Sequence, residues 1–148
     1  MSRGLLVGHD AAVAEWAFHT FRLVPTQYNL AVGIVGQGQL VGAVLLQNWN
    51  GVNVELSYYG EGTLTPGIVR SVARMVWGTY HPSRVTVVTS RSNRRLVRSL
   101  QRLGFCLEGT QRRYYGDRDC RRSTGVRLVM FRERVAELAG CSQNAGAA

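Results

Sequence analysis

A strand–helix–strand run over residues 84–109, RVTVVTSRSNRRLVRSLQRLGFCLEG, constrains the fold more than any other part of the sequence. Its first seven residues are rich in β-branched side chains, which is typical of a short buried strand. Over 93–103, four aliphatic residues fall on one stripe of a helix and four arginines on the other, so one side must pack and the other must face water or anions. Gly104 stands where a helix ends in the left-handed conformation.

Two further helices are predicted on either side of a region with strand periodicity. Asp10 can cap a helix over about 11–22, in which apolar residues recur at helical spacing. Thr65 can cap a second helix, and Pro66 suits its first turn because proline has no amide hydrogen to satisfy there. The histidine–proline pair at 81–82 ends this second helix.

The strands between and after these helices predict a mixed sheet. Asn50-Gly51 is the pair that a type I′ hairpin turn prefers, and the residues beyond it alternate between apolar and polar. The fold class is therefore α+β: a mostly antiparallel central sheet of about six strands, flanked by three or four helices. The predicted strands lie at 30–35, 40–48, 52–59, 84–90, 105–115 and 126–131.

The length and composition indicate one globular domain. A chain of 148 residues can bury a core but is too short to divide comfortably into two. We assign residues 1–135 to the domain and 136–148 to a flexible C-terminal tail, because the tail has too little apolar surface to fold. No apolar run is long enough for a membrane span, and the N-terminus does not have the pattern of a secretory signal, so we expect a cytoplasmic protein. Cys106, Cys120 and Cys141 form no CxxC pair and indicate neither a disulfide framework nor a metal site.

The positive charge is concentrated in the C-terminal half. All 18 basic residues are arginines, the formal net charge is +9, and 14 of these arginines lie at or after Arg84. Such a half should attract a polyanion, either a nucleic acid or a phosphate-rich cofactor.

The run over 84–109 resembles the C-terminal half of the GNAT superfamily of N-acetyltransferases. The resemblance rests on a strand, Ser92-Asn93, an aliphatic-basic helix and the motif LGFxxEG at the start of the next strand. More loosely, it extends over the order of elements from 28 to 132. The chain length and the segment GTLTPGIVR are similar to short members encoded by bacteriophages. The resemblance implies acetyl-CoA as the cofactor and a primary amine as the acceptor, on a protein, a small molecule or an aminated nucleotide base.

The resemblance also implies where the cofactor binds. In this family the asparagine that opens the helix, here Asn93, contacts the pantetheine arm, and the strand before the central helix holds the thioester through its backbone. The phosphate loop corresponds to GEGTLTPGIVR, which lacks part of the family's signature but keeps small residues and a helix N-terminus; it also suits a plain turn with a threonine cap. The expected cofactor-binding residues are Ser57, Tyr58, Tyr59, Gly62, Thr63, Thr65, Gly67, Arg91, Asn93, Arg94 and Arg98.

Acetyl transfer to an amine also needs a base that accepts the proton of the incoming ammonium group. Strand alternation puts Glu55 on one face with Ser57 and Tyr59, so Glu55 is the candidate base, directly or through water. The tyrosine that protonates the leaving thiolate in many members is replaced here by Leu100. The candidate acids are Ser99, Tyr114 and Tyr115, whose other roles are packing and solvation, although a thiolate of pKa about 8.5 can also leave without an acid.

The two departures from the family pattern leave a second hypothesis open. Leu100 and the incomplete phosphate loop also suit a GNAT-fold protein without turnover that binds a bacterial protein or nucleic acid. The arginines beyond those a cofactor needs can select an acidic protein surface or a nucleic acid as partner. The sequence also leaves open a homodimer formed through an exposed sheet edge.

Overall fold

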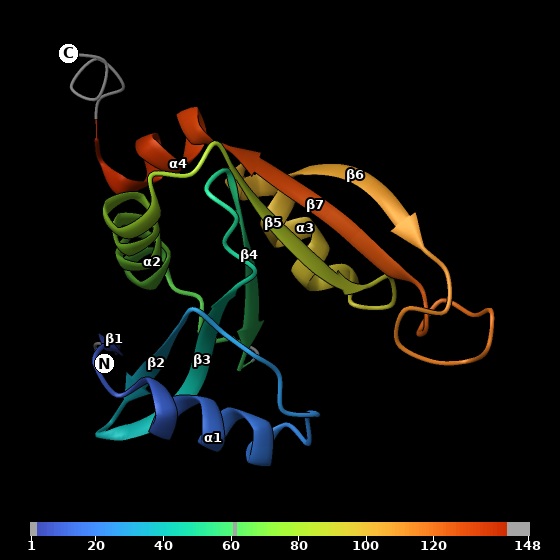
Figure 1. Cartoon of the computed structure of the whole chain (residues 1–148), viewed down its shortest axis with the longest axis horizontal. Helices are drawn as coiled ribbons and strands as arrows, with labels where there is room; N and C mark the ends of the chain where they lie inside the picture. The colour runs from blue at the N-terminus through green and yellow to red at the C-terminus, as the bar shows by residue number, and fades with distance from the viewer. Residues whose placement is uncertain (1–2, 61, 142–148) are drawn as a thin grey trace.

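A seven-stranded mixed sheet forms the centre of the computed structural model, which describes residues 3–60 and 62–141 (Figure 1). The strand order is β1-β2-β3-β4-β5-β7-β6, and all neighbours are antiparallel except β4 and β5. The α+β class and the mostly antiparallel sheet are thus confirmed. The strands are β1 (Arg3–Leu6), β2 (Leu30–Gly36), β3 (Gln39–Gln47), β4 (Asn53–Tyr59), β5 (Arg84–Ser90), β6 (Cys106–Gln111) and β7 (Gly125–Phe131).

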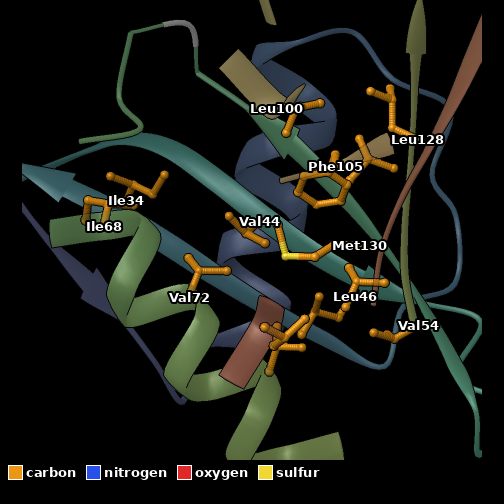
Figure 2. Close-up of a cluster of buried hydrophobic side chains, with 14 of the residues drawn as sticks. Ile34, Val44, Leu46, Val54, Ile68, Val72, Leu100, Phe105, Leu128 and Met130 are labelled. Atoms are coloured by element: carbon orange, nitrogen blue, oxygen red, sulfur yellow. The ribbon is translucent and has the colours of Figure 1, made fainter. Parts of the chain in front are cut away.

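Four helices cover the sheet: α1 (Asp10–Thr20), α2 (Pro66–Tyr80), α3 (Arg94–Leu103) and α4 (Arg132–Ala139). α1 packs on β2 and β3 through small residues on both sides, among them Ala17 and Ala43. The larger core lies on the other face of these strands. Figure 2 shows Ile68 and Val72 of α2 near Ile34 and Val44 of the sheet, in a cluster that also includes Leu100 and Phe105. None of the helices in the described residues is long and apolar enough to cross a membrane.

Several helix ends form as the sequence predicts. Thr65 accepts a hydrogen bond from the amide of Ile68, and Pro66 is the first residue of α2. Gly104 ends α3 with φ of 115°, in the left-handed region that glycine adopts without strain. Asp10 has a different role from the predicted cap: it begins α1, and its Oδ2 accepts the Ala31 amide at 2.8 Å. This bond fixes α1 to the first residues of β2.

Two elements were not predicted. β1 adds a seventh strand by pairing with the edge of β2. α4 follows β7 directly and buries Val135, Ala136 and Ala139, so the chain remains packed beyond the predicted domain end at 135. The described part of the predicted tail, 136–141, therefore begins within a helix; residues 142–148 lie outside the described residues.

The connections also differ from the prediction in two places. β3 and β4 are joined by residues 48–52, a longer loop than a type I′ turn, because the Asn50 side chain accepts the amides of Val52 and Asn53 and holds the chain in a wider turn. β6 ends at Gln111 instead of reaching 115. Arg113 has a positive φ of 55°, which is incompatible with a continuing strand.

Candidate active site

The two parallel strands in the middle of the sheet separate from each other. β4 and β5 pair only at Asn53 with Arg84, Val54 with Val85 and Glu55 with Thr86, and then diverge (Figure 1). One edge of β4 at residues 56–59 and one edge of β5 at residues 87–90 therefore face a gap and are not paired with each other. Backbone amides and carbonyls at such edges can bond an extended ligand.

A cavity of about 600 Å³ lies at this separation. Its walls are mostly apolar, with a few polar groups that point inward, which is the usual make-up of a small-molecule or cofactor site. The end of α1 and the loop after it contribute Phe18, Leu23, Val24 and Thr26. Of the residues predicted from the sequence, seven line this cavity: Glu55, Ser57, Tyr58, Tyr59, Asn93, Tyr114 and Tyr115.

Glu55 stands on one wall with a short network of polar side chains. Its Oε2 accepts a hydrogen bond from Asn48 Nδ2 at 3.0 Å. Ser57, the next residue on the same face, donates to Gln47 Oε1 at 2.9 Å, and Gln47 in turn donates to Thr26 Oγ1 at 2.8 Å. The network joins β4 to the loop after α1. The sequence analysis did not include Gln47 and Thr26 among the site residues. The pairing of β3 with β4 could have indicated Gln47, because it lies opposite Glu55 in the register.

Tyr58 holds the loop between β4 and α2. Its hydroxyl donates to the Gly60 carbonyl, lies 2.8 Å from Thr63 Oγ1 and accepts the Thr63 amide at 3.1 Å. Thr63 is buried with 5% exposure. Gly60 has φ of 111°, and a Cβ there would lie 2.7 Å from the Gly42 Cα, so only glycine fits this close approach. Gly60 and Thr63 are thus held against the strand that precedes them.

The rest of this loop leads into α2, and of its described residues Leu64 lines the cavity whereas Gly62, Thr63 and Thr65 do not. Gly62 and Gly67 are exposed, and a Cβ on either would meet nothing within 4 Å. Thr65 uses its hydroxyl as the helix cap. Arg3 Nη1 donates to the Gly62 carbonyl at 2.7 Å, which brings a cation from the N-terminal strand to the loop. No sequence signal linked Arg3 to this loop, because the contact depends on the unpredicted strand β1.

Tyr114 and Tyr115 enter the site from the loop between β6 and β7. Both amides donate to the Ser123 carbonyl, and the Tyr114 ring packs so closely on Gly125 that a Cβ there would lie 3.1 Å from its Cγ. The Tyr115 hydroxyl donates to the Val88 carbonyl of β5 at 3.2 Å. Burial, with a smaller effect of Tyr114, raises the pKa of Tyr115 to about 12. Burial also raises the pKa of Tyr59.

Asn93 occupies the N-cap position of α3, but its side chain makes no capping hydrogen bond. The amide group is therefore free to meet a ligand in the cavity that it lines. Leu96, Leu100 and Leu103, at helical spacing from Asn93, line the same cavity.

The other predicted residues of this region lie elsewhere. Arg94, Arg98 and Ser99 are exposed and are not among the cavity-lining residues. Because Arg94 and Arg98 fall between the positions that face the cavity, they lie on the outer side of α3. Arg91 lines a second, smaller hollow of about 420 Å³, together with Arg112, Asp119 and Arg121 among others.

The sequence matches no family profile and no curated protein, but the structure is similar to several solved acetyltransferases. A chimaeric spermidine N-acetyltransferase SpeG, from Vibrio cholerae and hSSAT, superposes with a TM-score of 0.71 at 11% identity, over 91% of this chain and 99% of that one. A GNAT-family acetyltransferase from Streptococcus pneumoniae gives a TM-score of 0.65 at 12% identity, over 88% and 99%. A GCN5-related N-acetyltransferase from Brucella melitensis gives 0.60 at 17% identity, over 75% and 54%. The chain has the GNAT fold.

Within the GNAT fold the residue seven positions after Asn93 is Leu100, which is 5% exposed and packs in the core. Leu100 also lines the cavity, but a leucine supplies no hydroxyl there. In the described residues, the tyrosines that line the cavity come instead from β4 and from the β6–β7 loop. The GNAT fold is thus kept while the side chains around the gap differ from the family pattern.

Proposed function

We propose that the protein is an acetyl-CoA-dependent N-acetyltransferase that transfers the acetyl group to a primary amine by direct attack on the thioester. The observation that carries the proposal is the separation of β4 and β5 beside a cavity that both Glu55 and Asn93 line. Asn93 is the N-cap residue of α3, and its side chain makes no capping hydrogen bond. The fold is that of solved acetyltransferases. One of them is named as a spermidine N-acetyltransferase, and another as an acetyltransferase of the GNAT family.

The residues around the gap fit an extended cofactor arm. Strand edges at 56–59 and 87–90 offer backbone donors and acceptors, and the free amide of Asn93 adds a side-chain donor and acceptor. The amides at the start of α2, with Arg3 beside Gly62, supply positive potential for phosphate groups. Bound acetyl-CoA would supply the activated acetyl group; the chain supplies its position and the proton transfers.

Glu55 is the base in this proposal. It is half-buried in the cavity wall, and the Asn48 donor orients its carboxylate. An amine enters the site as an ammonium ion and must lose a proton before it can attack, so the carboxylate accepts this proton directly or through a water molecule. Ser57 and Gln47 hold the adjacent wall and the loop after α1 in place.

The proposal needs no strong acid. The Tyr115 hydroxyl is bonded to Val88, and its pKa of about 12 makes it a poor proton donor near neutral pH. Of the other two candidate acids, Tyr114 lines the cavity and its hydroxyl has no hydrogen-bond partner among the described residues, while Ser99 lies outside the cavity. A thiolate with a pKa of about 8.5 leaves readily without protonation.

The cavity favours an amine with one charge and an apolar body. Glu55 is the single carboxylate among the cavity-lining residues that the structure describes, and the aromatic residues Phe18, Tyr59, Tyr114 and Tyr115 are among the residues that line it. A polyamine carries several positive charges, which need several carboxylates, and aromatic faces suit a single cation attached to an apolar group.

The direct test is a turnover assay that follows release of free coenzyme A in the presence of single amines. Phenethylamine and tyramine should be acetylated with a kcat/KM at least tenfold above that of spermidine. Comparable rates for spermidine would contradict the assignment of the acceptor. Lack of turnover with every amine, peptide N-termini included, would contradict the enzyme assignment itself.

The alternative is a GNAT-fold binding protein without turnover. Leu100 in the core and the incomplete phosphate loop favour it. It predicts that the protein binds neither acetyl-CoA nor free coenzyme A, which separates it from an enzyme whose acceptor has not been found.

A further inference from the structure

A dense group of arginines has no part in the proposed reaction. Between residues 91 and 122 the chain contains ten arginines and three carboxylates, so this segment carries seven of the nine net positive charges. Its first part, residues 91–107, contains five arginines and no carboxylate. Salt bridges therefore cannot neutralise most of this charge from nearby positions in the sequence.

Four of these arginines form a stripe along α3. Arg94, Arg98 and Arg102 are spaced four residues apart, about 6 Å along the axis, and Arg95 lies beside them on the same arc. All four are exposed, and none has a carboxylate within salt-bridge distance among the described residues. The opposite side of the helix packs on the core and lines the cavity through Leu100 and its neighbours. The stripe therefore faces solvent, away from the proposed cofactor site.

The loop between β6 and β7 extends this charge beyond α3. The Arg91 amide donates to the Thr124 carbonyl at 2.7 Å, and Ser90 Oγ donates to the Arg122 carbonyl at 2.7 Å. These bonds fix the loop against the start of α3. The second hollow then brings Arg91 together with Arg121.

Part of the loop's charge is already neutralised. Asp119 accepts hydrogen bonds from Arg112 and Arg113, and these partners lower its pKa. Arg91, Arg118, Arg121 and Arg122 are exposed and have no such carboxylate partner in the described part of the chain. We call these four residues, together with Arg94, Arg95, Arg98 and Arg102, the arginine face.

We infer that the arginine face binds the phosphate backbone of a nucleic acid without regard to its sequence. Phosphates occur every ~1.7 Å along a duplex axis, and planar guanidinium groups bond their oxygens in pairs. The arc of α3 that carries the stripe offers no apolar side chain, whereas protein interfaces have an apolar, charge-depleted centre. Nucleic-acid interfaces are instead polar and strongly positive. The chemistry of the face thus favours nucleic acid over an acidic protein.

The test is fluorescence anisotropy with a labelled 20-base-pair DNA duplex and a 20-nucleotide single strand, titrated at several salt concentrations. Each neutralised phosphate adds about 0.9 to the slope of log K against log salt, so the four arginines of α3 alone predict a slope of about −3.6 on the duplex. Between 50 and 200 mM salt the duplex affinity should then fall roughly 100-fold.

Two matched variants give the control. Arg95→Gln/Arg102→Gln changes two exposed side chains of the stripe, and Arg22→Gln/Arg70→Gln changes two exposed arginines outside α3 by the same net charge. Glutamine keeps the helix propensity close to that of arginine. The stripe variant should reduce the salt slope by about two and leave acetyl-CoA binding and thermal unfolding unchanged, while the control variant keeps the wild-type slope.

Three outcomes would overturn the inference. The first is absence of binding to both probes at 50 mM salt, and the second is an equal loss of affinity in the two variants. The third is displacement of the duplex by polyglutamate at equal charge concentration, which would identify an acidic protein surface as the partner instead.

Discussion

Replacing Tyr58 of β4 by phenylalanine removes the hydroxyl that holds Gly60 and Thr63, next to the proposed phosphate site, against the strand. That hydroxyl is bonded to the Gly60 carbonyl and to both the amide and the hydroxyl of Thr63, a residue with 5% exposure. A buried hydrogen bond contributes about 1 kcal/mol net, and a buried group left without a partner costs about 1–3 kcal/mol. Because Thr63 keeps its bonds to Gly60, we expect a loss near the lower end, about 1–2 kcal/mol of unfolding free energy.

A double-mutant cycle separates this network from general packing effects. Thr63→Val removes the other partner while it keeps the shape of the side chain, and a pair in direct contact should show a coupling energy of about 1 kcal/mol in urea unfolding. Tyr80→Phe is the matched control, because it removes a hydroxyl from an aromatic residue that packs on Trp49 far from the loop. If the losses of unfolding free energy in Tyr58→Phe and Thr63→Val add within about 0.3–0.5 kcal/mol in the double variant, the reasoning is refuted. Weaker acetyl-CoA binding by Tyr58→Phe, but not by Tyr80→Phe, would connect the loop to the cofactor.

Three other predictions concern the cavity. Glu55→Gln should lower kcat about 10²- to 10⁴-fold and leave the Kd of acetyl-CoA unchanged, as expected for loss of a base; an unchanged kcat would exclude Glu55 from that role. Gly125→Ala should push the Tyr114 ring away, since its Cγ lies 3.1 Å from the new Cβ, and should raise the KM of the amine; an effect on cofactor affinity alone would contradict this placement. Since burial raises the pKa of Tyr115 to about 12, its contribution to stability is complete below the unfolded value of about 10 and is lost as the pH rises toward 12. The urea midpoint should therefore fall more between pH 10 and 11.5 in the wild type than in Tyr115→Phe, and an equal fall would exclude this cause.

Local signals predicted the elements that carry them. The aliphatic stripe and Gly104 define α3, and Thr65 caps α2 as its side chain and the following proline indicate. β1 and α4 carry no comparable signals. β1 is a four-residue strand whose pairing with the edge of β2 depends on tertiary contact, and the N-cap residue of α4, Phe131, makes no side-chain cap. α4 is instead stabilised by packing on α2, which no local pattern reports.

The contribution of β4 to the site was predictable from the resemblance, which places the cofactor beside the strand before the central helix. Strand alternation alone does not select the lining residues, because Leu56 and Tyr58, on the opposite face from Glu55, Ser57 and Tyr59, also line the cavity. The prediction for α3 depended on the resemblance, which grouped Arg94 and Arg98 with Asn93. Helical spacing separates them, because Asn93 shares its side with Leu96 and Leu100, whereas the arginines fall on the other side. The contact of Arg3 with Gly62 could not be predicted, since it joins residues 59 positions apart through an unpredicted strand.

The central claim is that the gap between β4 and β5 binds acetyl-CoA. Its most direct test is calorimetric titration of acetyl-CoA and of free coenzyme A into the wild type, Asn93→Ala and Ser99→Ala. Ser99 is the matched control because it lies on the same helix, exposed and outside the cavity. The account predicts micromolar binding to the wild type, at least tenfold weaker binding to Asn93→Ala and no change in Ser99→Ala. If the wild type binds neither ligand, the GNAT fold of this chain serves a purpose other than acetyl transfer.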